Sequence, residues 1–361
     1  MEKILFIIYI ASVGVSLFYY LFFYLRAGLY RSRLEGIKPD PVSVIIAARN
    51  EAANLRENLP DILSQKGIEF EVVVVDDRSN DDTQSVLTEI QDSRIRTLRI
   101  EPTESNDTGW NKKRALSAGI NAAEYEHLVF TDADCKPRSV NWLLYMAEGL
   151  MKKEIVIGAS PIIPTAGFWN QWFAFDAFVI AVQYLSFALA GIPYMGVGRN
   201  MGYRKSLFVS SGGFEKHENK ASGDDDLFIN ETARANNVEV VLHHEAMTVS
   251  KSKDKLNIWI DRKVRHVSTA PIYKSRHKIL LIIMPVSQYI VFGLFVVLLC
   301  TQNYTKYVVL LFLMRYLTQQ IVFYRCLLNM NMTQFKTTGY LYETWQLFVY
   351  PVVFLKQIFR R

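Results

Sequence analysis

Residues 4–25 form an uncharged, apolar run near the start of the chain, ILFIIYIASVGVSLFYYLFFYL. At a rise of about 1.5 Å per residue, a helix of this length crosses the roughly 30 Å hydrocarbon core of a membrane. A secretory signal would have a shorter apolar core, a more basic front and a small-residue cleavage site, and this run has none of these. We therefore expect residues 1–28 to be a membrane anchor.

The basic residues beside the anchor indicate its orientation. Only Lys3 precedes the run, and four basic residues follow it: Arg26, Arg31, Arg33 and Lys38. By the positive-inside rule, the chain after the anchor lies in the cytoplasm. We therefore expect an integral protein of the cell (inner) membrane with a cytoplasmic folded domain.

A second membrane region is expected over residues 279–361. Residues 279–300 and 307–328 are apolar and are predicted to cross the membrane twice, joined by the short outer segment TQNYTK. The last apolar segment, about residues 340–358, carries Glu343, a proline and a basic end. We expect an interfacial or re-entrant helix here, because a crossing would place the terminal arginines outside.

Residues 41–278 mix charged and apolar residues without repeats, which predicts one cytoplasmic domain. Short β-branched runs alternate in its first part with helical patterns. The predicted strands are residues 42–50, 70–77, 94–100 and 127–134, and the predicted helices are residues 51–65, 83–90 and 112–124. Nearly continuous valine and isoleucine in the strands is typical of a mostly parallel sheet with helices on both faces. The expected fold class is therefore α/β.

Three of these strands end in polar sets, AARNE, DDRSNDD and TDAD. The carboxyl ends of parallel strands meet at one edge of the sheet, where ligands bind. A lone D-x-D is more often a solvated turn, but crowded carboxylates repel one another unless they hold a cation or a ligand hydroxyl. Oxygen ligands of this kind favour Mg²⁺ or Mn²⁺, and Mg²⁺ usually shares its shell with phosphates. Asp132 and Asp134 therefore predict a metal site for a phosphate-bearing substrate.

The chain lacks a P-loop and lacks a GxGxxG after its first strand, so lysine and metal are expected to hold the phosphates. Lys112 opens the helix before TDAD, where a helix amino end favours an anion. The alternative is a solvated helix start. Further on, Asp224, Asp225 and Asp226 precede a helical pattern and either cap that helix or supply a general base.

Charge and cysteine content exclude other classes. The chain has 41 basic and 35 acidic residues, and this +6 excess is too small to predict a nucleic-acid partner without clustered basic stripes. The three cysteines show no paired spacing, so neither a disulfide framework nor a zinc site is expected.

Taken together, these motifs resemble the family 2 glycosyltransferases, inverting enzymes that use nucleotide sugars and have the GT-A fold. The resemblance covers about residues 41–273 and consists of six degenerate elements in the family's order: VSVIIAARNE, VVVVDDRSNDDT, NKKRAL, FTDADCKP, GRNMGYRK and SGDDDLF. It implies a nucleotide-sugar-binding half over residues 41–150 and a half for the acceptor and the base over residues 151–278.

The resemblance also implies roles for individual residues. The expected donor contacts are Ala48, Arg49, Asn50, Glu51, Asp77, Lys112, Asp132 and Arg265. Asp134 is the expected main ligand of Mg²⁺ or Mn²⁺, with Asp132 as its partner. Asp225 is the expected base, with Asp224 left open because three aspartates in a row make the register uncertain by one residue. Arg199 and Asn200 are expected on the acceptor side.

One departure from the family pattern bears on the product. Processive synthases of the family carry QxxRW, and the corresponding residues here, 262–266, read RKVRH. With about three membrane crossings, the chain also lacks the helices for a polymer channel. The resemblance therefore implies transfer of a single sugar, with a UDP-sugar as the expected donor and a lipid-linked or membrane-embedded acceptor.

Three alternatives remain open. The aromatic segment at residues 167–193 is either a buried core helix or an interfacial helix that guides a lipid acceptor. The whole chain could be a non-catalytic membrane scaffold with a glycosyltransferase-like domain. A haloacid-dehalogenase-like phosphatase also uses D-x-D, but it needs that motif on its first strand, and here two strands precede it.

Overall fold

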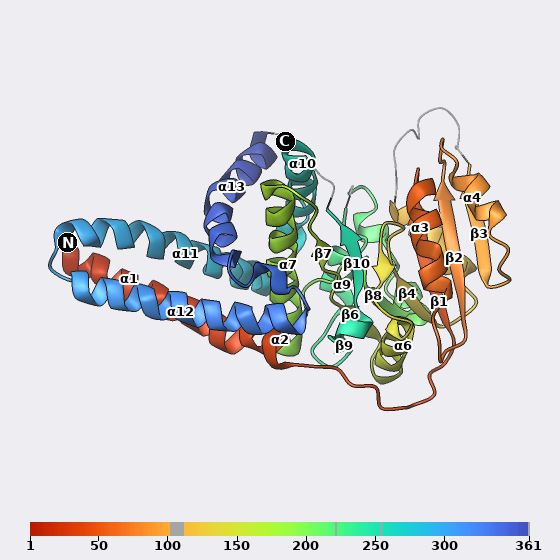
Figure 1. The fold of residues 1–361 in the computed structure, drawn as a ribbon, viewed down its shortest axis with the longest axis horizontal. Helices are drawn as coiled ribbons and strands as arrows, with labels where there is room; N and C mark the ends of the chain where they lie inside the picture. The colour runs from red at the N-terminus through yellow and green to blue at the C-terminus, as the bar shows by residue number, and fades with distance from the viewer. Residues whose placement is uncertain (102–111, 221, 253–254, 360–361) are drawn as a thin grey trace.

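The computed structural model describes residues 1–101, 112–220, 222–252 and 255–359. The molecule is elongated, with three long helices at one end, the sheet domain at the other, and a layer of transverse helices between them (Figure 1). Arg360 and Arg361, which motivated the interfacial prediction for the last helix, lie outside the described residues.

A seven-stranded sheet forms the centre of the folded domain, in the order β3-β2-β1-β4-β8-β6-β9. The strands are β1 (Val42–Ala48), β2 (Phe70–Asp77), β3 (Ile95–Ile100), β4 (His127–Phe130), β6 (Ile155–Gly158), β8 (Met201–Arg204) and β9 (Val238–Val241). The first four strands are parallel, as predicted, whereas β8 runs antiparallel to both β4 and β6. The mostly parallel α/β fold is thus confirmed.

Alternation of side chains along the strands builds a core on each face of the sheet. One face packs against α5 (Lys112–Ala122) and α9 (Asp226–Thr232), and the other packs against α3 (Ala52–Leu63), α4 (Thr83–Glu89) and α6 (Trp142–Lys152). Helix α5 lies close to the strands, because a Cβ on Gly119 would approach Ile45 Cγ2 to 2.8 Å. This close packing fixes the start of α5 relative to the strand ends.

A second, three-stranded sheet extends the domain beside β9. It consists of β5 (Lys136–Pro137), β10 (Thr248–Lys251) and β7 (Ile162–Ile163), in that order. Helix α8 (Lys205–Ser210) follows β8 directly. The small sheet places the chain after the D-x-D against the chain after β9.

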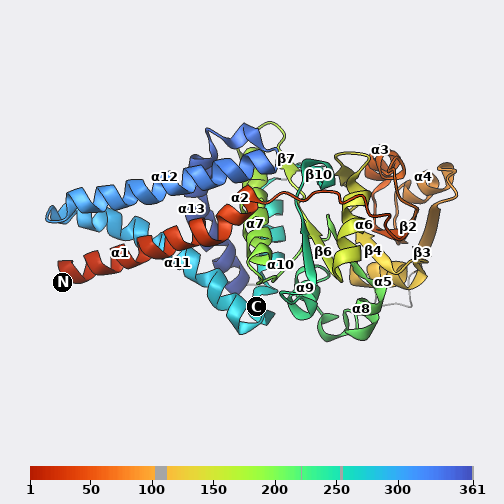
Figure 2. The same ribbon diagram turned by 90° about the horizontal axis from the view of Figure 1, so that it is seen from below.

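Three long helices lie side by side in both views and form one end of the molecule (Figures 1 and 2). They are the N-terminal helix, α11 (Ser275–Thr301) and α12 (Thr305–Asn329). The N-terminal helix comprises α1 (Glu2–Phe18), a π-helical turn (Tyr19–Tyr24) and α2 (Leu25–Leu29). Each of the three is long and apolar enough to cross a membrane. The predicted apolar runs are therefore helices of sufficient length.

A layer of three transverse helices separates this bundle from the sheet. They are α7 (Phe168–Leu189), α10 (Leu256–Val267) and α13 (Gly339–Phe359), and they cross the direction of the bundle in both views (Figures 1 and 2). Helix α7 is also long and apolar enough to span a membrane, yet 67% of its apolar window is buried inside the protein. Its surroundings favour the core-helix interpretation of residues 167–193.

Candidate functional site

The loops after β1 and β2 are locked together at the edge of the sheet. The register pairs Ala48 with Asp76, so both strands end at the same level. Asn50 has a left-handed backbone (φ 57°), and its N–H donates to Ser79 Oγ at 2.9 Å. Asn80 N–H in turn donates to Asn50 Oδ1 at 2.8 Å. The predicted donor contacts at residues 48–51 are thus held in one rigid turn.

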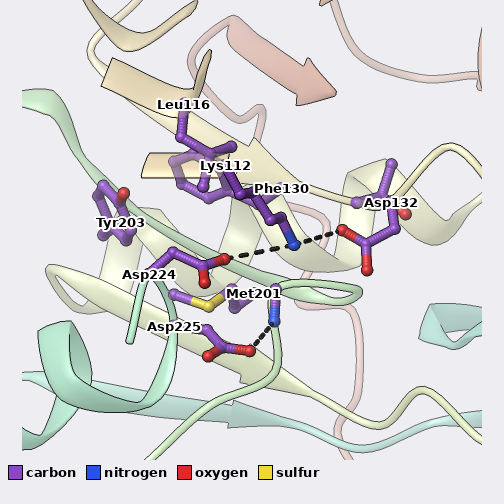
Figure 3. Close-up of a pocket in the computed structure, with 10 residues that line it drawn as sticks. Lys112, Leu116, Phe130, Asp132, Met201, Tyr203, Asp224 and Asp225 are labelled. Atoms are coloured by element: carbon purple, nitrogen blue, oxygen red, sulfur yellow. Dashed lines mark hydrogen bonds and ion pairs between the residues drawn. The ribbon is translucent and has the colours of Figure 1, made fainter. Parts of the chain in front are cut away.

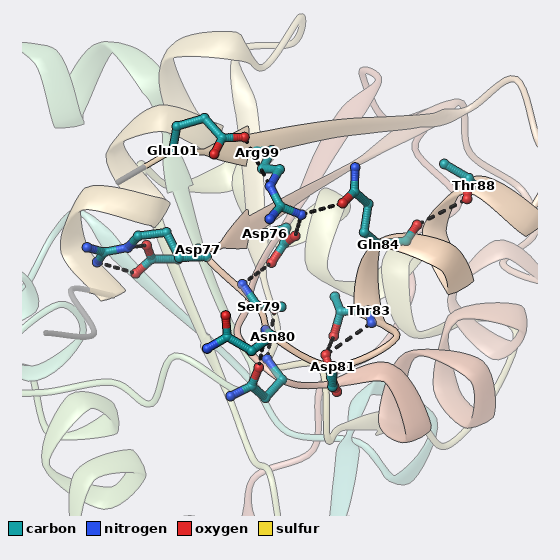
Figure 4. A network of polar contacts seen from close by, with 12 residues as sticks. Asp76, Asp77, Ser79, Asn80, Asp81, Thr83, Gln84, Thr88, Arg99 and Glu101 are labelled. Carbon is teal, nitrogen blue, oxygen red and sulfur yellow. Dashed lines mark hydrogen bonds and ion pairs between the residues drawn. The ribbon is translucent and has the colours of Figure 1, made fainter. Parts of the chain in front are cut away.

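The two aspartates that end β2 are engaged by neighbouring protein groups (Figure 4). Asp76 accepts from Ser79 N–H at 3.1 Å and from Arg99 Nη1 at 3.3 Å. Asp77 is fully buried, and Arg78 Nε donates to its Oδ1 at 2.7 Å. Asp77 was predicted to contact the donor, and this role stays a prediction for a carboxylate that is buried in the structure. A contact there would require Arg78 to move.

The strand end after β4 is arranged differently (Figure 3). Lys112 Nζ, on the first residue of α5, lies 2.7 Å from Asp132 Oδ1 and 3.3 Å from Asp224 Oδ2. Burial alone would raise the pKa of Asp132, but the ion pair with Lys112 lowers it below its ordinary value. Lys112 therefore forms ion pairs both with Asp132 of the D-x-D and with Asp224, the first of the three aspartates before α9.

Those three aspartates point in different directions. Asp225 caps α9 and accepts from Gly198 N–H at 2.9 Å. Asp226 is buried and accepts from the hydroxyls of Thr269 and Tyr273 at 2.5 and 2.6 Å, so its role is internal. Burial and then the neighbouring charge of Asp224 raise the pKa of Asp225 to about 7. A carboxylate with this pKa can accept a proton near neutral pH.

A pocket joins these groups between β4, β8 and the segment before α9. Its lining residues are Lys112, Leu116, Phe130, Thr131, Asp132, Gly198, Met201, Tyr203, Asp224 and Asp225. Most of the apolar members belong to strands or helices of the core and carry no signal in the sequence that marks them as pocket residues. The acidic members and Lys112 were predicted.

Two arginines add positive charge on the side of the transverse helices. After Lys112, the charges of Arg199 and Arg262 also lower the pKa of Asp132. Arg199 Nη1 donates to Ser250 Oγ at 3.1 Å, which ties it to β10. Arg265, the predicted donor contact, is exposed on α10. Arg262, one turn earlier on the same helix, was missed because it occupies the place of the family's glutamine.

Two predicted polar residues have internal roles instead. Asn200 is fully buried: its side chain donates to the carbonyls of Ala159 and Ala246 and accepts from Trp142 Nε1. The amide of Asn200 thus joins β8 to neighbouring segments, and its acceptor-side role stays a prediction. Lys113 is also buried and donates to the carbonyl of His217 at 2.5 Å. Asn111, which begins the NKKRAL element, lies outside the described residues.

Comparison with known proteins identifies the domain that holds this site. Residues 43–210 match the family profile described as Glycosyl transferase family 2. These residues belong to glycosyltransferase family 2. The matched range includes VSVIIAARNE from Ser43 onward and all of VVVVDDRSNDDT, NKKRAL, FTDADCKP and GRNMGYRK, whereas the three aspartates before α9 follow it.

Curated relatives match the family 2 domain over short segments. The succinoglycan biosynthesis protein ExoO of Rhizobium meliloti is 34% identical over 96 residues, covering 27% of this chain and 26% of the relative. The 4,4'-diaponeurosporenoate glycosyltransferase of Staphylococcus haemolyticus is 32% identical over 126 residues, covering 34% and 32%. The matches therefore span about a third or less of the length of these relatives.

A solved structure supports the fold over nearly the whole chain. A mannosyltransferase from Pyrobaculum calidifontis, in complex with GDP-Man and Mn²⁺, aligns with a TM-score of 0.59 at 18% identity. The alignment covers 96% of this chain and 98% of that one. At this identity the similarity establishes the GT-A architecture of the family 2 domain together with the flanking helices.

The acidic groups of the family 2 domain are compatible with a divalent cation. Burial, and then the charges of Asp134 and Asp132, raise the pKa of Glu51, so three carboxylates share one negative region. Asp134 is exposed and available as a ligand. Oxygen ligands suit Mg²⁺ or Mn²⁺, which commonly take further ligands from substrate phosphates and water. Asp134 and Asp132 would therefore hold such an ion jointly with a phosphate-bearing donor.

One other cluster has the composition of a metal site. Among the described residues, His243, His244 and Glu245 are the group of three whose ligand atoms lie within 4.8 Å of one another. Glu245 accepts from Asn141 Nδ2 at 3.1 Å, and His243 stacks on Tyr145. This group lies between β9 and β10, beside the start of α6, and does not line the pocket.

Proposed function

We propose that this chain is a membrane-bound inverting glycosyltransferase. It transfers a single sugar from a nucleotide-diphosphate sugar to a hydroxyl of a lipid-linked or membrane-embedded acceptor, in the synthesis of a cell-envelope glycan or glycolipid. The observation that carries the proposal is the Lys112 bridge, which brings Asp132 of the D-x-D and Asp224 beside the base into one pocket. The family match supports it, as do the relatives named as a succinoglycan biosynthesis protein and a 4,4'-diaponeurosporenoate glycosyltransferase.

The donor lies, in this proposal, along the ends of β1, β2 and β4. Arg49, Asn50 and Glu51 border the nucleotide, and Lys112 and Arg262 face its phosphates with positive charge. Mg²⁺ or Mn²⁺, held by Asp134 and Asp132, would offset the charge on the diphosphate as it leaves. Fixed cations near a leaving diphosphate stabilise the transition state by several kcal/mol, because they need no reorganisation during the reaction.

Asp225 is the proposed base. The acceptor hydroxyl oxygen attacks the anomeric carbon, the bond from that carbon to the diphosphate oxygen breaks, and Asp225 takes the hydroxyl proton. A pKa near 7 leaves a substantial fraction of Asp225 ionised at neutral pH. Asp224 is the less suitable base, because Lys112 holds its carboxylate on the donor side of the pocket.

The membrane setting explains the choice of acceptor. The pocket lies in the domain next to the transverse helices, and α10 carries Arg262 from that layer towards Asp132. A water-soluble donor can enter at the sheet edge while an acceptor hydroxyl arrives from the side of the lipid. A bundle of three spanning helices is small for a polymer channel, which favours a single transfer.

A donor screen tests the proposal. Detergent-solubilised protein is mixed with Mn²⁺, a membrane lipid extract and one of a panel of UDP- and GDP-sugars, and nucleotide release is measured. One donor should give release well above the acceptor-free background, and Asp134→Asn should abolish it. Absence of release with every donor would contradict the proposal. A calorimetric titration with UDP or GDP and Mn²⁺ then separates a non-catalytic scaffold, which should show no metal-dependent binding.

A further inference from the structure

Helix α13 has an exposed apolar stripe that the fold leaves uncovered. Six large apolar side chains recur at intervals of four and three residues, which places them on one face of a helix. They are Leu341, Trp345, Phe348, Val352, Leu355 and Phe359, with exposed fractions between 42% and 84%. A soluble helix would carry charged side chains on such a face. The stripe therefore needs an apolar environment outside the chain.

Polar contacts attach α13 to the protein on the sides that the stripe leaves free. Glu343 Oε1 accepts from Tyr20 OH at 3.2 Å and from Gln288 Nε2 at 3.1 Å, which attaches the start of the helix to the bundle. Tyr350 OH donates to Asp176 Oδ1 at 2.7 Å, and Lys356 Nζ lies 3.0 Å from Asp261 Oδ1. These contacts fix the rotation of α13 about its axis. The stripe therefore faces away from the protein.

The position of α13 indicates what covers the stripe. The helix runs across the direction of the spanning bundle in both views, near the end of the bundle that faces the sheet domain (Figures 1 and 2). Its surface is continuous with the exposed apolar face of α11, since Tyr289 OH of α11 donates to the carbonyl of Leu347 at 3.0 Å. Exposed Ile282 and Val286 lie on that same face of α11. Lipid that surrounds α11 therefore also reaches α13.

We propose that the stripe of α13 binds the boundary between lipid headgroups and acyl chains, as an amphipathic helix lying in the plane of the membrane. An in-plane helix of this kind buries its apolar face at the boundary and keeps its polar face away from the acyl chains. Here the polar face is satisfied by protein. The inference concerns the membrane rather than the sugar transfer, so it stands or falls separately from the proposed function.

The same contacts connect the lipid surface to the donor pocket. Asp176 of α7 is 1% exposed, and its carboxylate accepts from Tyr350 of α13 while lying 2.5 Å from Lys263 Nζ of α10. Lys263 is the next residue after Arg262, whose charge acts on Asp132. Helix α13 thus positions α10 through Asp176. The depth of α13 in the lipid therefore determines where Arg262 and Lys263 of α10 lie.

Trp345 provides a direct test of the stripe. The full chain is reconstituted in phosphatidylcholine vesicles whose acyl chains carry bromine either close to the headgroup or close to the methyl end. The fluorescence of a Trp345→Phe variant is subtracted to isolate Trp345 from the other tryptophans. Bromine near the headgroup should quench Trp345 at least twofold more than deep bromine. Stronger quenching by deep bromine, or no quenching because protein covers the stripe, would overturn the inference.

Hydrogen exchange tests the connection to α10. Tyr350→Phe removes one hydroxyl from the contact with Asp176 and leaves the apolar stripe intact. Loss of one buried hydrogen bond should raise deuterium uptake in residues 256–267 about fivefold. Tyr324→Phe, which removes an exposed hydroxyl on α12, is the matched control and should leave that uptake unchanged. If Tyr350→Phe raised uptake in α13 alone, α13 would not position α10.

Discussion

Strands β2 and β4 lie on either side of β1 in the sheet, and each leads into a pair of aspartates with different surroundings. At the end of β2, Asp76 and Asp77 are buried, and they form ion pairs with Arg99 of β3 and with Arg78 of the following loop. At the end of β4, Asp132 shares Lys112 with Asp224, while Asp134 is exposed. Both pairs lie at the same edge of the sheet and differ in their exposure to solvent. We therefore expect the exposed Asp134, rather than the buried pair of β2, to contribute most to the proposed function.

The largest effect on sugar transfer is expected at the aspartates that follow β4, Asp132 and Asp134. Asp134→Asn removes the exposed ligand of the proposed metal, and we expect sugar transfer to fall about 10⁴-fold, equivalent to about 5 kcal/mol of transition-state stabilisation. The apparent melting temperature should stay unchanged, because Asp134 supports little of the core. Transfer is measured with the donor found in the screen and excess Mn²⁺. Full activity of this variant would show that sugar transfer does not require Asp134.

The next largest effect is expected at Asp225, the proposed base. Asp225→Asn keeps a side chain that can cap α9 and should lower transfer about 10³-fold through loss of the base. Because the pKa of Asp225 is raised to about 7, the wild-type rate should rise with pH through about 7, as the base loses its proton. Asp225→Asn should flatten this profile, whereas Asp224→Asn should retain it. A flat profile in Asp224→Asn with a normal one in Asp225→Asn would exchange their roles.

The raised pKa of Asp225 also predicts a gain in stability for the same variant. An acid whose folded pKa exceeds its unfolded pKa binds more protons when folded, so it lowers stability as pH rises between the two values. Removing that acid should raise the apparent melting temperature at pH 8 and leave it nearly unchanged at pH 4. Thermal unfolding in detergent checks this. A lower melting temperature at pH 8 would show that Asp225 mainly supports the fold.

Lys112 should have a smaller effect on catalysis. Lys112→Met keeps the length of the side chain and removes its charge, and we expect transfer to fall about 10²-fold, as for loss of one preorganised charge at a leaving group. Lys205→Met, at the start of α8 and outside the pocket lining, is a matched control, since Lys205 Nζ donates to the backbone carbonyls of Asn121 and Ala123. Equal losses in both variants would indicate general damage to the fold.

Substitution of the aspartates that end β2, Asp76 and Asp77, should cause the smallest change in catalysis and a clear change in stability. Asp77→Ala removes the buried carboxylate that Arg78 binds, which should cost about 3 kcal/mol and lower the apparent melting temperature by several degrees. Transfer at a temperature where the variant is folded should fall by less than Asp134→Asn. A loss equal to that of Asp134→Asn, at unchanged stability, would show that Asp77 contacts the donor after all.

The parallel half of the sheet could be predicted because its signals are local. Valine-rich runs and intervening helical patterns predicted the first four strands with every bound within four residues of the observed one and both bounds of β2 correct. The antiparallel placement of β8 could not be predicted in the same way. Its pairing with β4 and β6 depends on contacts far apart in the sequence, and β5 and β7 are only two residues long.

The proximity of site residues could be predicted where their residue type and place in the expected sheet determine it. It could not be predicted where contacts with other side chains determine it. Asp132 and Lys112 were placed together correctly, because a strand end and a helix start at the same sheet edge must meet. The internal contacts of Asp77 and Asn200 could not be predicted, since sequence does not show that Arg78 turns back onto its neighbour or that Trp142 reaches Asn200. Arg262 was missed because it occupies the place of the family's glutamine.

The π-helical turn at Tyr19–Tyr24 leads to a consequence for acceptor choice. A π turn frees backbone carbonyls for outside donors. Here the carbonyl of Tyr24 accepts from Ser186 of α7 and from Cys326 of α12, at 3.4 Å each. These two contacts attach the N-terminal helix to both α7 and α12. If the proposed function holds, such a rigid connection would keep Asp225 at a constant distance from the lipid surface, and acceptors would be selected by the distance from their hydroxyl to their lipid tail.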